Sequence, residues 1–270
     1  VCVCVCACAC ACAFFLQEVK GSDRHKTLSE IENWRTCDIK SEAELLDAQY
    51  LCLLDVETTF FEKLGRRLTI KYDHDTIELA SVMIDAKTGE TVSTFQQYVQ
   101  PVRKISRFCT ELTGVTQEFI DEKGVPFSEA LEAHEKWFHE VTKGAFCIVC
   151  ICGDRDLRKI MPSQCSMSKI EVPFYLRRWG NLKSWYLKTI PQRKRINGIK
   201  DMLQSLEMKL EGRHHNGIDD CKNMAKICGH LLGRSFKPFV TGSTDNSHMR
   251  HIIHGRGGRG GRGGRGGRGG

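Results

Sequence analysis

Short apolar runs mark the expected strands of this chain, and the first begins at residue 50. Residues 50–56 (YLCLLDV) are almost continuously apolar, which is typical of a strand buried on both faces. Residues 77–85 and 91–99 are two more strand-like runs, and the KTG sequence at residues 87–89 between them predicts a hairpin turn. Residues 145–152 (AFCIVCIC) predict a fourth strand, again apolar throughout.

Helical periodicity fills the segments between and after these strands. In residues 127–141 the apolar positions can share one helix face, and Ser128 is the predicted N-cap. Helices are also predicted at residues 105–112, 157–161, 198–206 and 218–232. Strands with a hairpin, followed by helices that alternate with a further strand, indicate an α/β fold with helices packed on both faces of the sheet.

Low-complexity sequence at both ends sets the expected domain boundaries. Residues 1–13 alternate Val or Ala with Cys. We interpret them as a translated two-base repeat without a fold of its own; a thiol-rich metal-binding strip and the apolar core of a signal peptide are the alternatives. The chain starts with Val1 and not Met, which suggests a fragment or an uncertain start. The predicted order is this repeat, an N-terminal extension at 14–48, one folded domain at 49–236, a linker at 237–254 and an RGG-repeat tail at 255–270.

The net charge of +7 comes mostly from the C-terminal tail. The last 16 residues hold five arginines, so residues 1–254 carry a net charge of only +2. This balanced body, in a chain with 41% hydrophobic residues overall, is typical of an ordinary folded domain. The glycine-rich tail cannot bury a core and is expected to be disordered, like the N-terminal extension. No stretch reaches the roughly 20 apolar residues of a membrane-spanning helix, which excludes an integral membrane protein.

The cysteines indicate a reducing compartment. Of the 15, nine lie outside the N-terminal repeat and are scattered, which argues against a secreted disulfide scaffold and for an intracellular protein of the cytoplasm or nucleus. Cys147, Cys150 and Cys152 lie inside an apolar strand without a partner pair at zinc-site spacing, so we interpret them as buried thiols. His134 and His139 are five residues apart, do not align on a helix, and are expected at the surface.

Candidate chemistry begins at the end of the first strand. Asp55 and Glu57 are two residues apart, so both carboxylates would project to the same side. Two anions held so close repel each other unless a cation lies between them, which is how divalent metal sites are commonly built. By itself the pattern is weak, because a D-x-E sequence occurs about once by chance in a chain of this length.

Two further acidic motifs follow in the chain. GDRD at residues 153–156 comes directly after the fourth strand, and HHNGIDD at residues 214–220 opens the last helix. Each motif alone could be a helix N-cap with favourable charge at the helix dipole. Taken together, the three motifs supply four carboxylates and one histidine. Four carboxylates can hold two Mg²⁺ or Mn²⁺ ions on a phosphodiester, and a neutral histidine can deprotonate the attacking water.

The chain resembles a known family in these motifs and several others. The matching stretches are LLDVETT (53–59), TGETVSTFQQYVQP (88–101), FCTELTGVTQEFID (108–121), CGDRDL (152–157), WGNLK (179–183) and EGRHHNGIDDCKNMA (211–225). They resemble the DEDDh 3′→5′ exonucleases, and within them the histone-mRNA 3′-exonuclease type, also called the enhanced-RNAi type. The resemblance covers about residues 50–236 and implies a ribonuclease H-like mixed sheet flanked by helices on both faces.

The resemblance also implies a role for each motif residue. Asp55 would bridge two metal ions, Glu57 and Asp220 would complete the site of the first, and Asp156 would hold the second. His215 would be the general base. His214 with Asp219 has the same spacing as His215 with Asp220, but the family motif G-R-x-H-x-G-I/L-D-D selects the latter pair. The chain departs from the family at Arg155, where a tryptophan is usual, and an arginine there could compete for the carboxylates or bind a phosphate.

The activity implied is a metal-dependent 3′→5′ exoribonuclease that releases nucleoside 5′-monophosphates, using two Mg²⁺ or Mn²⁺ ions and RNA with a free 3′ end. Processing or turnover of structured or small RNA is the expected setting, and a monomer is the expected state. A nuclease that acts on DNA and a catalytically silent RNA-binding protein are the alternatives.

Two basic segments are candidates for nucleic-acid binding. In residues 177–195, basic side chains that include Arg193, Lys194 and Arg195 are interspersed with Trp179, Trp185 and Tyr186. Such a surface could hold phosphates and stack bases, unless the aromatic rings lie in the core. In the tail, the arginines alternate with glycines and predict RNA contact without sequence preference or, alternatively, ribonucleoprotein partners. These tail arginines are Arg256, Arg259, Arg262, Arg265 and Arg268.

Overall fold

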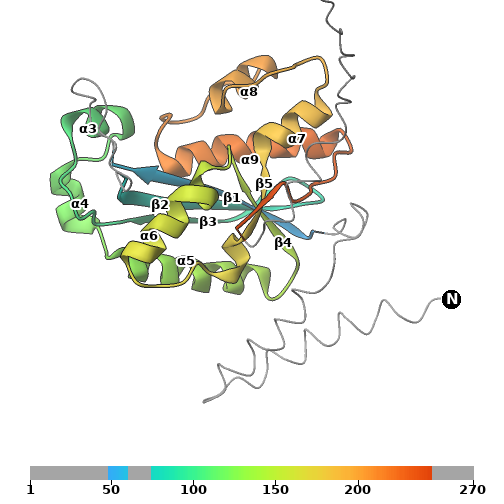
Figure 1. The fold of residues 1–270 in the computed structure, drawn as a ribbon. Helices are drawn as coiled ribbons and strands as arrows, with labels where there is room; N and C mark the ends of the chain where they lie inside the picture. The colour runs from blue at the N-terminus through green and yellow to red at the C-terminus, as the bar shows by residue number, and fades with distance from the viewer. Residues whose placement is uncertain (1–47, 60–73, 245–270) are drawn as a thin grey trace, which may run out of the picture.

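The computed structural model describes residues 48–59 and 74–244 (Figure 1). The predicted N-terminal repeat, the extension up to residue 47 and the RGG-repeat tail lie outside the described residues. The predictions made for them therefore stay predictions.

A six-stranded sheet lies at the centre of the described domain, in the order β3-β2-β1-β4-β5-β6 (Figure 1). The strands are β1 (Tyr50–Thr58), β2 (Thr76–Asp85), β3 (Thr91–Tyr98), β4 (Cys147–Ile151), β5 (Arg178–Asn181) and β6 (Gly242–Ser243). β1, β2 and β3 form an antiparallel meander, β4 runs parallel to β1 and β5, and β6 is antiparallel to β5. The carboxyl ends of β1, β4 and β5 therefore lie at one edge of the sheet, where open α/β sheets place their ligand sites.

Helices cover both faces of this sheet (Figure 1). One face carries α7 (Leu182–Thr189), α8 (Ile199–Ser205) and α9 (Gly217–Gly233), and the other carries α5 (Phe127–Thr142) and α6 (Met161–Met167). Two short helices, α3 (Arg107–Thr113) and α4 (Gln117–Lys123), lie at one end, and two single turns are η2 (Asp156–Ile160) and η3 (Phe174–Leu176). The predicted α/β architecture with helices on both faces is confirmed.

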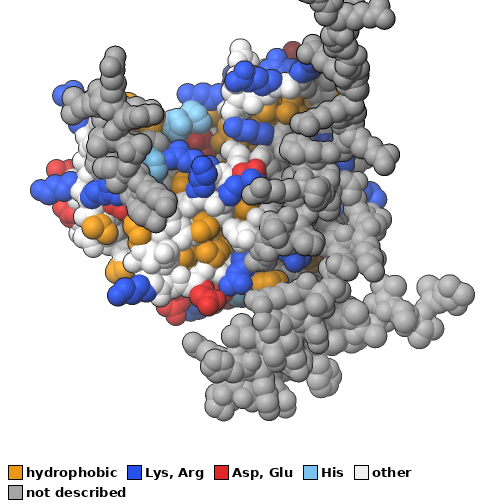
Figure 2. Space-filling model, viewed as in Figure 1, with side chains coloured by type: hydrophobic (Ala, Val, Ile, Leu, Met, Phe, Trp, Pro, Cys, Tyr) orange, Lys and Arg blue, Asp and Glu red, His pale blue; other side chains and the backbone are white. Residues whose placement is uncertain are grey.

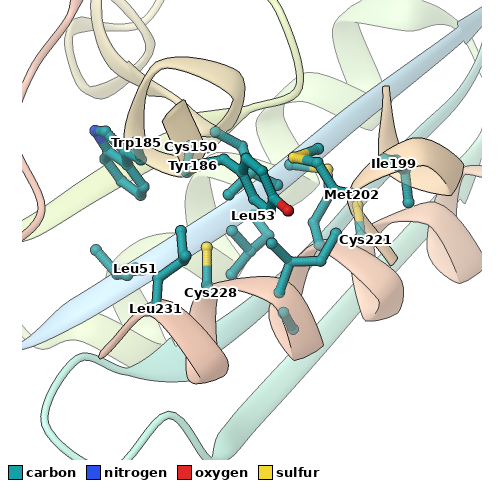
Figure 3. Packing of buried hydrophobic residues seen from close by; sticks show 14 of the residues in the cluster. Leu51, Leu53, Cys150, Trp185, Tyr186, Ile199, Met202, Cys221, Cys228 and Leu231 are labelled. Carbon is teal, nitrogen blue, oxygen red and sulfur yellow. The ribbon is translucent and has the colours of Figure 1, made fainter. Parts of the chain in front are cut away.

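β1 is buried on both faces because its side chains alternate between two cores. Leu51 and Leu53 pack toward α7, α8 and α9, as Figure 3 shows, whereas Cys52 and Leu54 pack toward α5 and α6. All four are at most 1% exposed. A strand buried on both faces cannot shift along its neighbours without repacking both cores, so β1 is a rigid support for the carboxylates near its carboxyl end.

The structure corrects the predicted helix start at Ser128. The N-cap of α5 is Pro126, and Ser128 lies inside the first turn without capping it. Pro126 has φ of −54°, an angle that the proline ring favours, and the helix follows from it directly.

The short elements α4, η3, β5, α7 and β6 were not predicted. β5 has four residues and α7 has eight, and the buried residues of α7 are interspersed with two lysines. The folded structure continues past the predicted domain boundary at residue 236. There, β6 pairs with β5, and the Phe239 carbonyl accepts a hydrogen bond from Trp185 Nε1 at 2.8 Å. None of the described helices is both long enough and apolar enough to cross a membrane.

Candidate active site

Three carboxylates meet at the carboxyl edge of the sheet. Asp55 and Glu57 lie near the end of β1, and Asp220 lies in the first turn of α9. One oxygen from each of the three lies within 4.8 Å of the other two. Glu57 is 5% exposed and Asp220 is 3% exposed, so the cluster lies mostly out of water. The structure brings together residues that the sequence places up to 165 positions apart.

Asp156 joins this cluster, whereas its neighbour Asp154 does not. Asp156 follows β4 as the first residue of the π-helical turn η2, and its negative charge is among the causes that raise the pKa of Asp55. The Asp154 carboxylate accepts hydrogen bonds from Trp179 Nε1 at 2.9 Å and from Asn181 Nδ2 at 3.1 Å. Asp154 therefore ties β5 to the loop after β4, which leaves Asp156 as the acidic residue that faces the cluster.

Asp55, Glu57 and Asp156 have shifted proton affinities. Burial, followed by the charges of the neighbouring carboxylates, raises the pKa of Asp55 well above its usual range and that of Glu57 to about 8. Burial raises the pKa of Asp156 to about 7, although the positive charges of Arg155 and Lys183 oppose the shift. Carboxylates that repel one another in a buried site are what a hard divalent cation with oxygen ligands would stabilise, so these residues fit Mg²⁺ or Mn²⁺.

We expect the metal-free protein to lose stability as the pH rises from about 5 to about 8. In this range the folded protein keeps protons on Glu57 and Asp156, whose pKa values are about 8 and about 7. The unfolded chain releases them near pH 4, so raising the pH favours unfolding by about 1.4 kcal/mol per pH unit for each retained proton. Urea unfolding in EDTA at several pH values measures this slope. Saturating Mg²⁺ should flatten it; a stability that rises with pH in EDTA would contradict the expectation.

The loop before α9 holds Asp220 at both of its oxygens. Its Oδ1 lies 2.9 Å from Nδ1 of His214, and its Oδ2 accepts a hydrogen bond from the backbone N–H of His215 at 3.0 Å. His215 has a positive φ of 66°, which turns the chain sharply before the helix. Its Nδ1 lies 4.0 Å from Oε1 of Glu57, and its side chain is 41% exposed. His215 thus stands between the carboxylate cluster and solvent.

His215 is suited to accept a proton near neutral pH. Burial and the neighbouring His214 lower its pKa, and the charge of Asp220 only partly opposes them. A neutral imidazole has one nitrogen lone pair available as a base.

The alternative in which Asp219 or Asp220 caps α9 is wrong: Asn216 is the N-cap, and its side chain accepts a hydrogen bond from the Asp219 N–H at 3.3 Å.

Glu78 is a residue of the site that the sequence analysis missed. It lies on β2 directly opposite Glu57 and is fully buried. Its carboxylate accepts hydrogen bonds from the backbone N–H groups of Gly217 at 3.0 Å and Ile218 at 3.3 Å, and from Gln96 Nε2 at 2.8 Å. Glu78 therefore holds the start of α9 against the strands that carry the other carboxylates. The signal in the sequence was a single acidic residue in an apolar strand, because an acidic side chain is rarely buried without a hydrogen-bonding or charged partner.

We expect Glu78→Ala to raise the Mg²⁺ concentration needed for half-maximal activity by about 10- to 100-fold. The substitution leaves two backbone N–H groups at the start of α9 without their acceptor, and changes of this kind behind metal ligands have effects of that size. The rate of RNA cleavage, the activity expected from the sequence, is measured at several Mg²⁺ concentrations to obtain this value. Glu90→Ala, at an exposed position of the β2–β3 hairpin, is the matched control. An unchanged Mg²⁺ requirement in a folded Glu78→Ala protein would show that α9 is positioned by other contacts.

The aromatic rings of the predicted basic surface lie in the core. Trp179 of β5 and Trp185 and Tyr186 of α7 are fully buried, so base stacking on them is excluded. Arg193, Lys194 and Arg195 are exposed in the loop before α8. Figure 2 shows Lys and Arg side chains beside exposed histidine on the viewed face. The tail arginines lie outside the described residues.

Lys183 connects this loop to the carboxylate site. Its Nζ donates a hydrogen bond to the Asn197 carbonyl at 2.7 Å, and its charge partly opposes the rise that burial causes in the pKa of Asp156. The same loop is held by Asp201, which accepts a hydrogen bond from the Arg193 guanidinium at 2.6 Å. Arg193 is therefore engaged in the fold as well as exposed.

The surface position expected for His134 is wrong. Its ring is fully buried, with Nε2 2.8 Å from Ser81 Oγ and Nδ1 2.6 Å from Tyr175 Oη. Two polar partners inside the core satisfy both ring nitrogens, and burial lowers its pKa to about 3. The prediction for Cys150 is confirmed, because its thiol is buried against α9, while Cys147 Sγ lies on the other face against Met83. The two cannot share a metal ion.

Comparison with known proteins agrees with this geometry. The sequence model of the family described as "Exonuclease" matches residues 52–228. The chain is 36% identical over 183 residues to the human protein named "ERI1 exoribonuclease 3", covering 62% of this chain and 52% of that protein. It is 32% identical over 188 residues to the human "3'-5' exoribonuclease 1", covering 68% and 52%. The chain thus spans about half the length of the curated relatives it matches.

Solved structures show the same fold. The nuclease domain of 3'hExo, described as a DEDDh family member bound to rAMP, has a TM-score of 0.67 at 28% identity, covering 73% of this chain and 98% of that one. A second structure, described as 3'-end specific recognition of histone mRNA stem-loop by 3'-exonuclease, has a TM-score of 0.65 at 28% identity, covering 72% and 85%. The predicted ribonuclease H-like fold is confirmed.

Proposed function

Because this chain belongs to the DEDDh exonuclease family, we propose that it removes nucleotides one at a time from the 3′ end of RNA and releases nucleoside 5′-monophosphates. The observation that carries the proposal is the convergence of Asp55, Glu57 and Asp220 within 4.8 Å, beside His215. This set of groups can hold cations on a phosphodiester and accept a proton from water.

The proposed metal ligands are the four carboxylates. Asp55, Glu57 and Asp220 would hold one Mg²⁺ or Mn²⁺ ion, and Asp55 with Asp156 would hold a second. When bound, the two ions would polarise the phosphodiester and make water more acidic. Burial and then mutual repulsion raise the pKa of Asp55 and Glu57, which supports this assignment, because cations would relieve the repulsion.

The chain's own residues would position and move the proton. His215 would accept a proton from the attacking water, since its pKa is lowered and its ring is partly exposed beside Glu57. Asp220 would hold the loop of His215 through the 3.0 Å bond from the His215 backbone N–H. Glu78 would keep α9 in place behind them. Arg155, exposed next to Asp156, would add positive charge where the phosphate backbone approaches.

The direct test uses the full chain and an RNA labelled at its 5′ end with a free 3′-hydroxyl. With Mg²⁺ or Mn²⁺ the labelled RNA should shorten stepwise from its 3′ end, and EDTA should stop the reaction. Asp55→Ala is the inactive control. A folded protein that binds the RNA but leaves it intact with either metal would favour the catalytically silent RNA-binding protein. Arg155→Trp would then be the first substitution to test for a gain of activity.

RNA is proposed over DNA because the relatives are named as exoribonucleases. A solved relative is described as recognising a histone mRNA stem-loop, which supports structured RNA as the substrate class here. Matched RNA and DNA oligonucleotides separate the alternatives, since only RNA offers the 2′-hydroxyl at the terminal nucleotides. Equal rates on both would point to the DNA-acting alternative or to a nuclease of broad range.

We expect the RGG-repeat tail to tether RNA through its five arginines. Replacing them with alanine should raise the KM for long RNA and reduce the salt dependence of binding. For single strands the slope of log K against log salt should fall by up to about 3.5, at about 0.7 per arginine. Binding measured at several salt concentrations gives this slope, and an RNA of a few nucleotides is the control. An unchanged slope would favour a tail that binds ribonucleoprotein partners.

A further inference from the structure

His214 is a side chain of the site that the proposed reaction does not use. Its ring lies 4.0 Å from the ring of His215, centroid to centroid, at an interplanar angle of 32°. The His214 side chain is 22% exposed, so solutes can reach it. It supplies neither a carboxylate nor the proposed base, yet it touches a residue of each kind.

The two histidines and Asp220 form a second group of potential metal ligands. One ligand atom from each of His214, His215 and Asp220 lies within 4.8 Å of the other two. One pair of these ligand atoms is already close, because His214 Nδ1 lies 2.9 Å from Asp220 Oδ1. Ligand atoms around a tetrahedral zinc ion stand about 3 Å apart, since each lies about 2 Å from the metal. The His215 ligand atom lies within 4.8 Å of both.

This ligand set selects a different metal from the carboxylate cluster. Asp55, Glu57 and Asp220 offer only oxygen, which suits Mg²⁺ and Mn²⁺. His214 and His215 add two imidazole nitrogens, which suit Zn²⁺, Ni²⁺ and Cu²⁺. Two nitrogens and one oxygen leave a fourth position for water, as in zinc sites with three protein ligands.

We propose that His214, His215 and Asp220 form an inhibitory site for Zn²⁺ and similar transition-metal ions. The inhibition, though not the metal binding, rests on the proposed function. Binding requires the lone pair of His214 Nδ1, which becomes available when the proton of the neutral ring moves to Nε2. The ion then replaces the contact between His214 and Asp220. It also occupies the lone pair with which His215 would accept a proton, and it withdraws Asp220 from the carboxylate cluster.

Metal binding is tested first, without reference to catalysis. Co²⁺ replaces Zn²⁺ as a probe, because its visible d–d absorption becomes intense in tetrahedral sites. Full-length protein is titrated with Co²⁺ in excess Mg²⁺, and His214→Gln is compared with wild type. Glutamine can still donate a hydrogen bond to Asp220 but has no imidazole nitrogen. Thiols elsewhere in the chain can also bind Co²⁺, but they are the same in both proteins, so the difference between the two visible titrations reports the histidine site.

The expected result is that His214→Gln weakens the Co²⁺ site that absorbs in the visible by at least about tenfold. His139→Gln, which removes an exposed histidine far from the carboxylates in sequence, should leave it unchanged. Identical visible titrations for wild type and His214→Gln would overturn the proposal. This outcome is independent of whether the protein cleaves RNA, so it separates a failure of the metal site from a failure of the proposed function.

Inhibition is tested second, as the rate of RNA shortening with added Zn²⁺ in excess Mg²⁺. Each protein is scaled to its own rate without zinc. The Zn²⁺ concentration for half inhibition should rise at least about tenfold in His214→Gln and stay the same in His139→Gln. Equal sensitivity of wild type and His214→Gln would place zinc inhibition at the carboxylates and overturn the proposal.

Discussion

Asp55→Asn is expected to reduce kcat by about 10³-fold or more and, at the same time, to make the metal-free protein more stable at pH 8. The loss follows because Asp55 is the proposed ligand of both metal ions, and metal assistance to such a reaction contributes several kcal/mol, at 1.36 kcal/mol per factor of ten. The gain follows because Asp55 is the carboxyl group that all the neighbouring carboxylates repel: its pKa is raised by burial and then by Glu57, Asp156 and Asp220.

The two halves of this expectation are measured separately. Single-turnover rates at saturating Mg²⁺ give the loss of activity, and thermal unfolding in EDTA gives the stability. The melting temperature should rise by about 2–4 °C for each kcal/mol of repulsion removed. Glu90→Gln removes an exposed carboxylate and should change neither quantity. An Asp55→Asn protein that melts lower in EDTA would mean that the carboxylates do not repel one another as the geometry indicates.

His215→Ala is expected to reduce kcat by about 10²- to 10⁴-fold, the range for loss of a general base. The rate of the wild type should fall on the acid side below about pH 6.5, because the pKa of His215 is lowered from that ordinary value. The variant should lose this dependence. Adding free imidazole should restore part of its rate, because the site opens to solvent where the ring stood.

His214→Ala is the matched comparison for this prediction. Its ring lies beside that of His215 and is hydrogen-bonded to Asp220, so its removal should cost far less than the loss of His215. The acid limb of the pH profile should also survive in His214→Ala. If instead His214→Ala abolished that limb and His215→Ala kept it, the general base would be His214, and the pairing with the same spacing, His214 with Asp219, would have to be reconsidered.

The sequence predicted those parts of the fold that have a clear period. The run at residues 50–56 is apolar at nearly every position because β1 has a core on each side, and Leu51 and Cys52 pack on opposite faces. The hairpin between β2 and β3 was visible from its turn residues. β5 and α7 were missed because they are short, and because the basic side chains interspersed with Trp185 and Tyr186 directed the interpretation toward an exposed surface.

Local sequence cannot show what a polar side chain contacts. His134 has a partner on β2 and another beyond α6, 53 and 41 residues away, and only those contacts make its burial possible. Glu78 likewise depends on backbone N–H groups 139 and 140 residues further along the chain. Burial without partners would be unfavourable for either side chain, so a sequence analysis places them at the surface or overlooks them.

By itself, the sequence determined which residue types can carry the chemistry and which elements present them: Asp55 and Glu57 on one side of a strand, and His215 and Asp220 at the start of a helix. This information is local, since strand and helix periods decide which neighbours in sequence project together. The tertiary structure decided what joins them. It separated Asp156 from Asp154 by their partners, buried the aromatic rings expected to stack bases, and placed Glu78 and His214 against the site. Those outcomes depend on contacts between distant segments, which exist only after the sheet and α9 have packed together.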